Sequence, residues 1–267
     1  MFDNMKIITF LTDFGTVDSY VAQMKGVVSS ISREAKLIDI THEVRPHDIR
    51  EGAFILRSVI PYLPMGTVHV AVVDPGVGTQ RRGLIITTKT HVLVGPDNGL
   101  LIPAAKFLGE FTVYEITNPE YTLKSISNTF HGRDIFSPVA AYITNGVPFD
   151  QIGTTTNNYV NLDFGKDEIT HKSATGKVIY IDRFGNIITN INGIRLSQIL
   201  NYDTKTMTFI GNNKEEIMYV KSYDYVKKGQ LLSTIGSSNY LEISMNQGDA
   251  AKKLKVKPDD PVKILFS

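Results

Sequence analysis

The sequence predicts an α/β N-terminal domain with a largely parallel sheet, followed by a smaller β-rich, barrel-like C-terminal domain. In the first half, apolar runs of strand length alternate with stretches whose apolar residues recur at helical spacing, which is typical of βαβ units. In the second half, short β-rich runs follow one another between turn residues, with almost no helical pattern. We expect the first domain at residues 1–160, a polar linker at 161–174 and the second domain at 175–267.

The first half predicts strands that are joined by helices. The first helix carries apolar residues at helical spacing over 21–31, with Asp18 or Ser19 as its N-cap. A second helix covers 49–63, where Pro64 ends it. The strands that these helices connect are predicted at 6–11, 37–41 and 67–73.

Acidic residues follow the carboxyl ends of these strands, at Asp13, Asp39 and Asp74. Ligands of parallel α/β sheets bind at this edge. At such a strand end, the carboxylate of Asp13 can accept hydrogen bonds from a vicinal ribose diol. Asp18, in contrast, is better explained as a helix cap.

The second half predicts a small antiparallel sheet or a barrel. Turn residues separate its β-rich runs, and the sequence contains no internal repeat or low-complexity tract. The predicted strands are 177–181, 186–191, 205–210, 230–235 and 240–244.

Composition excludes several classes of protein. The 267 residues are 42% hydrophobic and 21% charged, as in ordinary globular proteins, and the net charge of +1 gives no field to attract nucleic acid or an anionic membrane. The apolar run at 7–11 is too short to span a bilayer or to form a signal core. The absence of cysteine excludes disulfides, thiolate zinc sites and a cysteine nucleophile, and we expect a cytoplasmic protein.

The third predicted strand leads into a turn that holds one acid and two arginines. The stretch 71-AVVDPGVGTQRRGLIITT-88 contains Asp74, Arg81 and Arg82. These charges either form a solvated turn or meet over a substrate. The string 76-GVGTQR-81 lacks the third glycine of a dinucleotide fingerprint, and no Gly-Lys-Ser/Thr ending occurs, so nucleoside triphosphate chemistry is disfavoured.

The segment 39-DITHEVRPHD-48 raises a metal site as an alternative. His42 and His47 are not spaced to share one helix face, and Pro46 breaks any helix between them. A loop could still gather them with the neighbouring acids. We favour a polar loop that caps the helix beginning at Asp48, and we therefore expect no metal.

The segment 128-NTFHGRD-134 places His131 just before a predicted helix. A single histidine is more often structural than catalytic. This one lies in a loop beside Gly132, Arg133 and Asp134, which leaves the structural and catalytic interpretations evenly balanced.

Five segments together resemble one family, the S-adenosylmethionine (SAM) hydroxide adenosyltransferases. These proteins are relatives of the adenosyl-fluoride and adenosyl-chloride synthases. The resemblance covers nearly the whole chain, and the family's α/β N-terminal and β-rich C-terminal domains agree with the pattern above. The segments are 12-TDFGT-16, 71-AVVDPGVGT-79, 96-PDNGLL-101, 129-TFHGRD-134 and 180-YIDRFGNIITNI-191.

The resemblance implies roles for residues of the first domain. Asp74, Arg81 and His131 match the family's hydrolytic triad, and Asp13 matches the carboxylate that binds the ribose diol. Because a lone aspartate is a weak base for water, we expect Arg81, and His131 if protonated, to stabilise a developing hydroxide. We expect Arg82 to be solvated or in interface contacts.

The resemblance also implies substrate contacts in the second domain. Phe184 and Asn186 match the ligand-binding strand, with Asn186 near adenine, and Tyr223 resembles the aromatic residue that stacks on the purine. Asp182 matches the acid near the methionine amino group. Ser237 lies where the family holds the methionine carboxylate.

One position departs from the fluorinating relatives. They carry an arginine after the serine that holds the carboxylate, whereas this chain has Ser238. Recognition of the methionine carboxylate is therefore less firmly implied than the other contacts.

The activity implied is hydrolysis of SAM to adenosine and L-methionine by in-line attack of water or hydroxide on C5′. The sulfonium is already a good leaving group, so the main task is to place an oxygen behind C5′. SAM is the substrate, and no cofactor is expected. The family also implies a homotrimer with sites between subunits.

Two alternatives to hydrolysis come from other classes of protein. A halogenase would bring a halide close to Asp74, a like-charge contact that is costly in a site of low dielectric, and the short turn at 83–99 leaves no room for the insertion typical of fluorinating enzymes. A non-catalytic sensor of SAM or adenosine would need Asp13, Asn186 and Tyr223 but not the triad.

Overall fold

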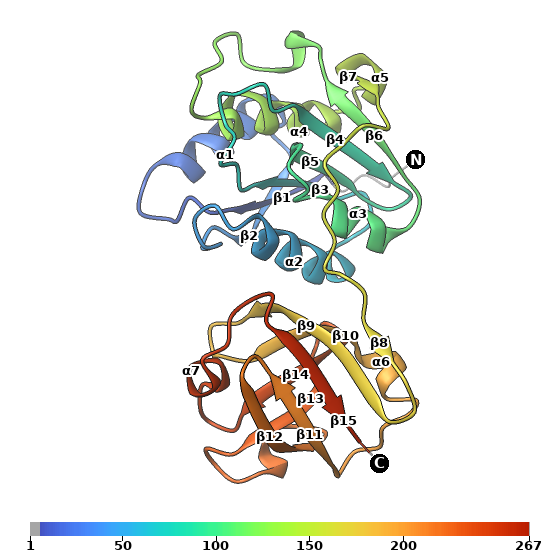
Figure 1. Ribbon diagram of the computed structural model, residues 1–267. Coiled ribbons are helices and arrows are strands. Elements are labelled where there is room, and N and C mark those ends of the chain that lie inside the picture. Colours follow the sequence, from blue (N-terminus) through green and yellow to red (C-terminus); the bar gives the residue numbers. More distant parts are fainter. Residues whose placement is uncertain (1–5, 267) are drawn as a thin grey trace. The chain divides into compact units, whose positions relative to one another are not determined.

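The computed structural model describes residues 6–266, which form two compact units (Figure 1). One unit extends to Asp163 and the other begins at Phe164, within the stretch 161–174 that the sequence predicts as a linker. The first unit is an α/β domain and the second a closed β-barrel, so the predicted fold class is confirmed. Within residues 6–266, none of the helices has the length and apolar character needed to cross a membrane.

The first unit is built on a seven-stranded sheet in the order β2-β1-β3-β5-β4-β6-β7. Strands β2, β1, β3 and β5 pair in parallel, whereas β4, β6 and β7 add antiparallel pairs beside β5. The strand ends that the sequence associates with a ligand therefore belong to the parallel half. The strands are β1 (Ile7–Thr12), β2 (Lys36–Thr41), β3 (Val68–Val72), β4 (Gly83–Thr88), β5 (Val92–Pro96), β6 (Phe111–Ile116) and β7 (Gly153–Thr155).

Helices cover both faces of this sheet. Helices α1 and α4 pack against each other on one face, and α2 and α3 pack together on the other (Figure 1). This double cover explains why β1, β3 and β5 are buried along their whole length and why their sequences are mostly apolar. The helices are α1 (Tyr20–Ile31), α2 (Ile49–Val59), α3 (Ile102–Leu108), α4 (Ser137–Thr144) and α5 (Phe149–Ile152).

Helix α2 begins as the sequence predicts but ends earlier. Asp48 is its N-cap, and the Oδ1 atom of Asp48 accepts a hydrogen bond from Glu51 N at 2.9 Å. The α-helix ends at Val59, and a 3₁₀ turn follows at Ile60–Tyr62. The prediction of a helix to residue 63 is too long because Pro61 in this turn has no N–H to continue the α-helical ladder.

The second unit closes into a barrel. Its strands run in the order β10-β14-β13-β12-β11-β15-β9, and pairing of β9 with β10 completes the ring. All pairs are antiparallel except β12 with β13. The elements are β8 (Glu168–Ile169), β9 (Ser173–Ile181), β10 (Ile187–Asn192), α6 (Gly193–Leu196), β11 (Thr204–Ile210), β12 (Asn213–Tyr219), β13 (Leu231–Ile235), β14 (Tyr240–Met245), α7 (Ala250–Leu254) and β15 (Pro261–Leu265).

The sequence did not predict β12 and β15. In β12, polar and charged residues alternate with residues that point inward, and only Ile217 and Tyr219 are buried. In β15, Val262 and Ile264 point inward between exposed neighbours. Both strands have one face in solvent, so charged residues interrupt each of them and neither strand forms a continuous apolar run in the sequence.

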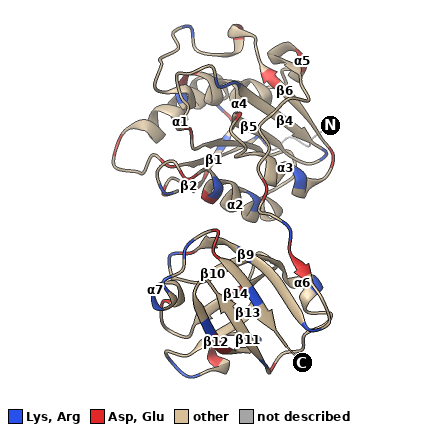
Figure 2. Ribbon diagram, viewed as in Figure 1, with Lys and Arg blue, Asp and Glu red and all other residues tan. Residues whose placement is uncertain are grey.

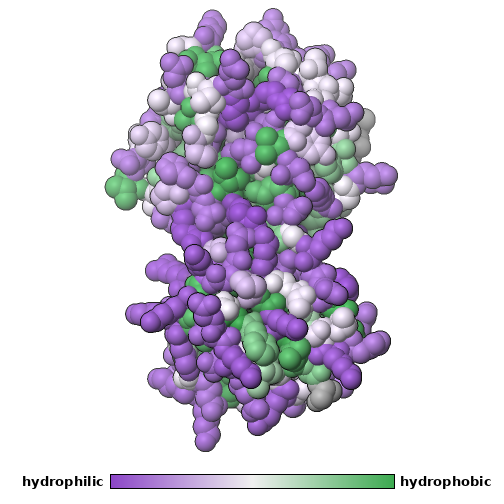
Figure 3. Space-filling model, viewed as in Figure 1, coloured by the Kyte–Doolittle hydropathy of each residue, from purple (hydrophilic) through white to green (hydrophobic). Residues whose placement is uncertain are grey.

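The surface of each unit is mixed in charge and mostly polar. Acidic and basic residues are dispersed over both units (Figure 2), and their charges sum to +1. The face seen in Figure 3 is largely hydrophilic, with small hydrophobic patches on each unit.

Candidate active site

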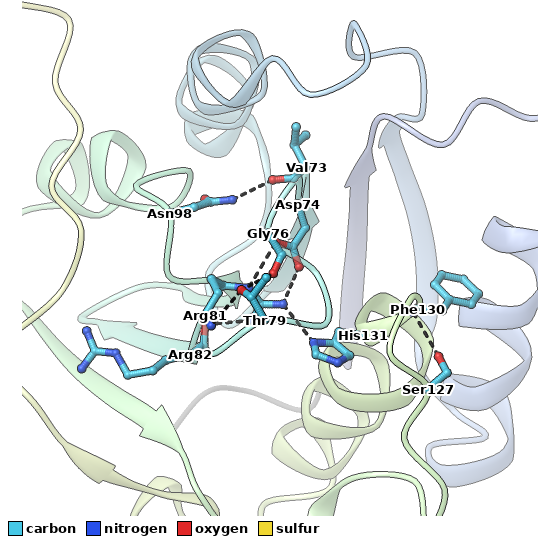
Figure 4. A network of polar contacts seen from close by, with 10 residues as sticks. All are labelled: Val73, Asp74, Gly76, Thr79, Arg81, Arg82, Asn98, Ser127, Phe130 and His131. Carbon is cyan, nitrogen blue, oxygen red and sulfur yellow. Dashed lines mark hydrogen bonds and ion pairs between the residues drawn. The ribbon is translucent and has the colours of Figure 1, made fainter.

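The loop between β3 and β4 carries Asp74 near its start and Arg81 near its end. Asn98 Nδ2 donates to Val73 O at 2.8 Å, which fixes the point where the chain leaves β3 (Figure 4). Thr79 Oγ1 accepts a hydrogen bond from Arg81 N at 3.2 Å. These contacts turn the loop back so that its acid and its guanidinium meet.

Asp74 and Arg81 form a two-pronged ion pair (Figure 4). Arg81 Nε donates to Asp74 Oδ1 at 3.1 Å, and Arg81 Nη2 donates to Asp74 Oδ2. Arg81 Nη1 donates to Arg82 O at 2.8 Å, and the guanidinium lies over the ring of Phe136. The Arg81 and Asp74 side chains are only 8% and 4% exposed. Each charge would be costly to bury alone, so this pairing fixes both groups in one orientation.

His131 joins the ion pair from a distant part of the chain. It directly precedes a π-helical turn at Gly132–Phe136, and its Nδ1 lies 3.0 Å from Arg81 Nη2. Because a guanidinium can only donate, Nδ1 accepts this hydrogen bond, and a neutral ring then carries its proton on Nε2. Burial, and then the charge of Arg81, lower the pKa of His131 below its usual value. The protonated His131 considered from the sequence is therefore disfavoured, and the ring is neutral at neutral pH.

Gly78 holds the two loops of this cluster together. Its φ is +76°, and a Cβ atom there would lie 2.1 Å from Asn128 O, in the loop that leads to His131. A residue without a side chain is needed for so close an approach. The loop that carries Arg81 is thereby fixed against the loop that carries His131.

Gly78→Ala is expected to move Arg81 away from His131 and to lower turnover by about tenfold or more, since a shift of roughly 1 Å at a reacting centre can cost about 100-fold. The fold should persist, because strain in one loop costs about 1–3 kcal/mol. Steady-state rates and thermal melts test this. Gly76→Ala is the matched control, because its Cβ would meet nothing closer than 3.7 Å. Equal rates for Gly78→Ala and the unmodified protein would contradict the expectation.

Asp134 shapes the loop around His131. It is fully buried, accepts from Ser127 N at 2.8 Å and pairs with Arg133, whose Nε lies 2.6 Å from Oδ1. Arg133 Nη1 also donates to Gln23 Oε1 on α1 at 2.8 Å. Burial alone would raise the pKa of Asp134, but the hydrogen bonds from Arg133 and Ser127 outweigh it and lower the pKa. The sequence did not assign these supporting contacts, although the acid three residues after the histidine was visible.

Arg82 lies outside the cluster. Its Nη2 donates to Asp97 Oδ2 at 2.5 Å and to Asn158 O at 2.6 Å, and its Nη1 lies 3.3 Å from Glu115 Oε2. The hydrogen bond to Asp97 raises the pKa of Arg82. The prediction that Arg82 is solvated is therefore wrong, because its side chain is paired within its own unit. The alternative of interface contacts stays a prediction.

Asp13 follows β1, which neighbours β3, so it emerges at the same edge of the sheet as Asp74. Its Oδ2 accepts a hydrogen bond from the backbone N–H of His47 at 2.8 Å. The imidazole of His42 lies elsewhere in this segment, with its Nδ1 at 2.8 Å from Thr12 Oγ1. Among residues 6–266, no group of three or more His, Cys, Asp or Glu side chains is arranged to hold a metal ion.

The second unit contains a cavity of about 650 Å³ at one rim of its barrel. The turn between β9 and β10 forms one wall, and the turn after β14 contributes to the rest. All the residues of this domain that the sequence predicts as substrate contacts line the cavity, and these are Asp182, Phe184, Asn186, Tyr223 and Ser237.

Asp182 organises the turn between β9 and β10. Its Oδ1 accepts from Phe184 N and Asn186 N, both at 2.9 Å, and its Oδ2 accepts from Asn186 Nδ2 at 2.8 Å. Gly185 completes the turn with a φ of +81°, where a Cβ would lie 2.1 Å from Asp249 Oδ1. The backbone therefore holds Phe184 out at the rim, with its side chain mostly exposed.

Glu242 is a cavity residue that the sequence analysis missed. It lies within β14, is 7% exposed, and its Oε1 accepts from Tyr223 Oη and Ser244 Oγ, both at 2.7 Å. Burial and this hydrogen bond raise the pKa of Tyr223 well above its usual value, so its hydroxyl keeps its proton. An acid inside the otherwise apolar strand 240-YLEIS-244 was the available signal.

The fold and these two sets of residues define a class of protein. The N-terminal domain model of the SAM hydroxide adenosyltransferases matches residues 8–153, and the C-terminal domain model matches residues 176–263. The chain belongs to this family, as the resemblance in sequence predicted.

Relatives within the family are similar over nearly their full length. The protein named (R)-S-adenosyl-L-methionine hydrolase from Methanocaldococcus jannaschii is 40% identical over 99% of this chain and 97% of its own length. The protein of the same name from Salinispora arenicola is 37% identical, over 96% and 97%. A fluorinase from Nocardia brasiliensis is 25% identical, over 97% and 96%. The crystal structure of an uncharacterized conserved protein from Thermotoga maritima matches with a TM-score of 0.92 at 37% identity, over 97% and 99%.

Proposed function

We propose that this protein hydrolyses S-adenosyl-L-methionine to adenosine and L-methionine by in-line attack of water on C5′. The observation that carries the proposal is the buried Asp74–Arg81 pair with His131 hydrogen-bonded to the same guanidinium. The family, and relatives at 37–40% identity that are named as SAM hydrolases, support the same chemistry.

The catalytic cluster has to hold and polarise one water molecule. The C5′–O bond forms as the C5′–S bond breaks, the thioether leaves as neutral methionine sulfur, and the proton that the water loses passes to bulk solvent. Asp74 accepts a hydrogen bond from this water, Arg81 fixes the carboxylate, and neutral His131 offers Nε2–H to the oxygen. No acid is needed for the leaving group, because a sulfonium departs without protonation.

The remaining residues would bind the ends of the substrate. We assign Asp13 to the ribose diol and Asp182 to the methionine amino group. Tyr223 provides an aromatic face for the purine, and Phe184 and Asn186 line the same cavity. Ser237 is assigned to the methionine carboxylate.

We infer that each complete site combines the N-terminal domain of one subunit with the C-terminal domain of a neighbour in a homotrimer, as the family resemblance implies. Mixing tests this directly. Asp74→Asn and Tyr223→Ala subunits, each inactive alone, should regain activity after they are unfolded and refolded together. Light scattering would give the mass of the assembly. A fully active monomer would contradict the proposal.

Hydrolysis is favoured over halogenation by the state of Arg81. Its guanidinium has five N–H donors, of which one on Nε, one on Nη1 and two on Nη2 already bind protein acceptors. Its charge also faces Asp74. A halide bound here would contact one remaining N–H donor and a neighbouring carboxylate. These contacts would not compensate for the free energy of the hydration shell that the halide loses.

The decisive experiment uses purified protein in H₂¹⁸O with SAM, with and without chloride and EDTA. Chromatography with mass spectrometry should give equal amounts of adenosine and methionine, with the label in the 5′-hydroxyl of adenosine. Because the hydrolase relatives are named for the (R) sulfonium epimer, we expect faster turnover of (R)-SAM than of (S)-SAM. A chlorinated nucleoside, loss of activity in EDTA, or binding without turnover would each contradict the proposal.

A further inference from the structure

We propose that His42 is a positioning residue for the substrate, because through Thr12 it fixes the loop that presents Asp13 to the ribose diol. The inference rests on the proposed role of Asp13. It starts from a chain of polar side chains that lies apart from the catalytic cluster. The chain runs from Lys25 on α1 through Asp39 on β2 and His42 to Thr12 at the end of β1.

Each link of the chain is short. Thr12 Oγ1 lies 2.8 Å from His42 Nδ1, and Lys25 Nζ donates to Asp39 Oδ2 at 2.6 Å. His42 Nε2 lies 3.0 Å from Asp39 Oδ1, in a geometry that gives an electrostatic contact rather than a directed hydrogen bond. The imidazole of His42 is buried, whereas Asp39 and Lys25 reach the surface. The ring therefore links the edge strand β2 to the end of its neighbour β1.

The hydrogen-bond directions along this chain are consistent with one another. Thr12 Oγ1 accepts from Phe14 N at 3.3 Å, so its single proton is available for His42 Nδ1. A neutral His42 then carries its own proton on Nε2, facing Asp39. The backbone O of His42 also accepts from Gly15 N at 2.7 Å. His42 thus holds the loop on both sides of Asp13, at residues 12 and 15.

The same segment also fixes Asp13 itself. Asp13 Oδ2 accepts from His47 N at 2.8 Å, and His47 has a φ of +68°, an unusual conformation for a residue with a side chain. We assign Oδ1 of Asp13 to the ligand. A carboxylate held in place before binding loses little entropy when the diol arrives, which favours affinity.

The burial of Thr12 argues against a catalytic role for these polar side chains. Hydroxyl, imidazole and carboxylate stand in the order Thr12–His42–Asp39, as in nucleophilic triads. Thr12 is fully buried, however, so its hydroxyl cannot reach a bound molecule. The linked side chains of Lys25, Asp39, His42 and Thr12 therefore act by positioning Asp13.

The test compares adenosine with 2′,3′-dideoxyadenosine by calorimetry on the full-length protein. The unmodified protein should bind adenosine about tenfold or more tightly, because hydrogen bonds to a charged group are the stronger kind. His42→Leu should bind the dideoxynucleoside within about twofold of the unmodified protein but lose most of the preference for adenosine. His42→Asn, whose amide can still reach Thr12, should keep part of it. His91→Leu, at an equally buried histidine of the same unit (4% exposed in both cases), should keep all of it.

The outcomes separate this inference from the proposed function. If His42→Leu loses affinity for adenosine and for the dideoxynucleoside equally, His42 is merely structural and the inference is wrong. An unchanged preference for adenosine in His42→Leu would also overturn the inference. If His42→Leu does not fold, Asp39→Asn at the surface should still weaken the preference, and no change there overturns the inference. A preference that survives Asp13→Asn, or is absent from the unmodified protein, would instead refute the assigned role of Asp13.

Discussion

Asp74→Asn is expected to lower the turnover of SAM by about 100-fold or more while the fold remains intact. The amide keeps the size of the carboxylate but presents N–H groups where Arg81 and the attacking water both need an acceptor. Arg81 would then lose its two-pronged contact, and His131 would lose the orientation that the guanidinium gives it. Steady-state rates at saturating SAM, with thermal melts, test the expectation.

The choice of variant follows from the burial of the pair. Arg81→Gln would also inactivate the enzyme, but it leaves a carboxylate of 4% exposure without its partner, which typically costs about 3–5 kcal/mol of stability. Asp74→Asn also removes one charge of the pair, but its amide oxygen can still accept a hydrogen bond from the Arg81 guanidinium. Thermal melts of each variant separate a loss of folding from a loss of catalysis. Arg82→Gln is the matched control, because it likewise takes an arginine from a carboxylate of 4% exposure, Asp97, but at a place outside the cluster. Its turnover should stay within a few fold, and a loss equal to that of Asp74→Asn would refute the assignment.

The N-terminal unit is expected to lose stability as the pH falls below 6.5. His69 Nδ1 lies 2.7 Å from Thr9 Oγ1, its Nε2 lies 3.2 Å from His91 Nδ1, and both histidines are buried. Burial, and then His91, lower the pKa of His69 to about 3. Burial also lowers the pKa of His91. Between pH 6.5 and 3 the unfolded chain takes up a proton that the folded chain refuses, so stability is full above this window and is lost on acidification.

Two variants test how much His69 contributes to this loss of stability at low pH. From pH 7 to 4.5 the His69 contribution alone amounts to about 2–3 kcal/mol of unfolding free energy. Urea denaturation at both pH values should show this loss in the unmodified protein and a smaller loss in His69→Gln, whose amide takes no proton. His171→Gln, at an exposed histidine, should leave the pH dependence unchanged. An equal pH dependence in all three proteins would contradict the role of His69.

The sequence predicts β1, β2 and β3 of the first unit, and burial on both faces makes β1 and β3 mostly apolar. It did not predict β4, β5, β6 or β7. It fails at β12, whose solvent face is charged, and at the end of α2, where Pro61 interrupts the ladder. At β12 the deciding factor is which face each residue presents, whereas at the end of α2 it is the missing N–H of Pro61. The orientation of the β12 side chains is not visible in the composition of that stretch.

The site is harder to predict than the fold. Asp74 and Arg81 share one loop and can be paired from sequence, but His131 joins them from 50 residues away. Its own loop left the structural and catalytic interpretations evenly balanced, and only the family resemblance connected it with the pair. The proton position on His131, the Asp97 partner of Arg82 and the buried Glu242 depend on which groups meet across the fold. Such contacts carry no local pattern, so three-dimensional coordinates are needed to find them.

The pairing of β9 with β10 has a consequence for which amino-acid substitutions the barrel can accept during evolution. A sheet that closes on itself leaves no row of unpaired backbone groups around the ring, so side chains can be exchanged in the turns at its rim without exposing a strand edge. Phe184 can therefore stand exposed on one of those turns without inviting other chains to add a strand. New ligand preferences can arise by exchange of rim side chains while the cylinder beneath them stays the same.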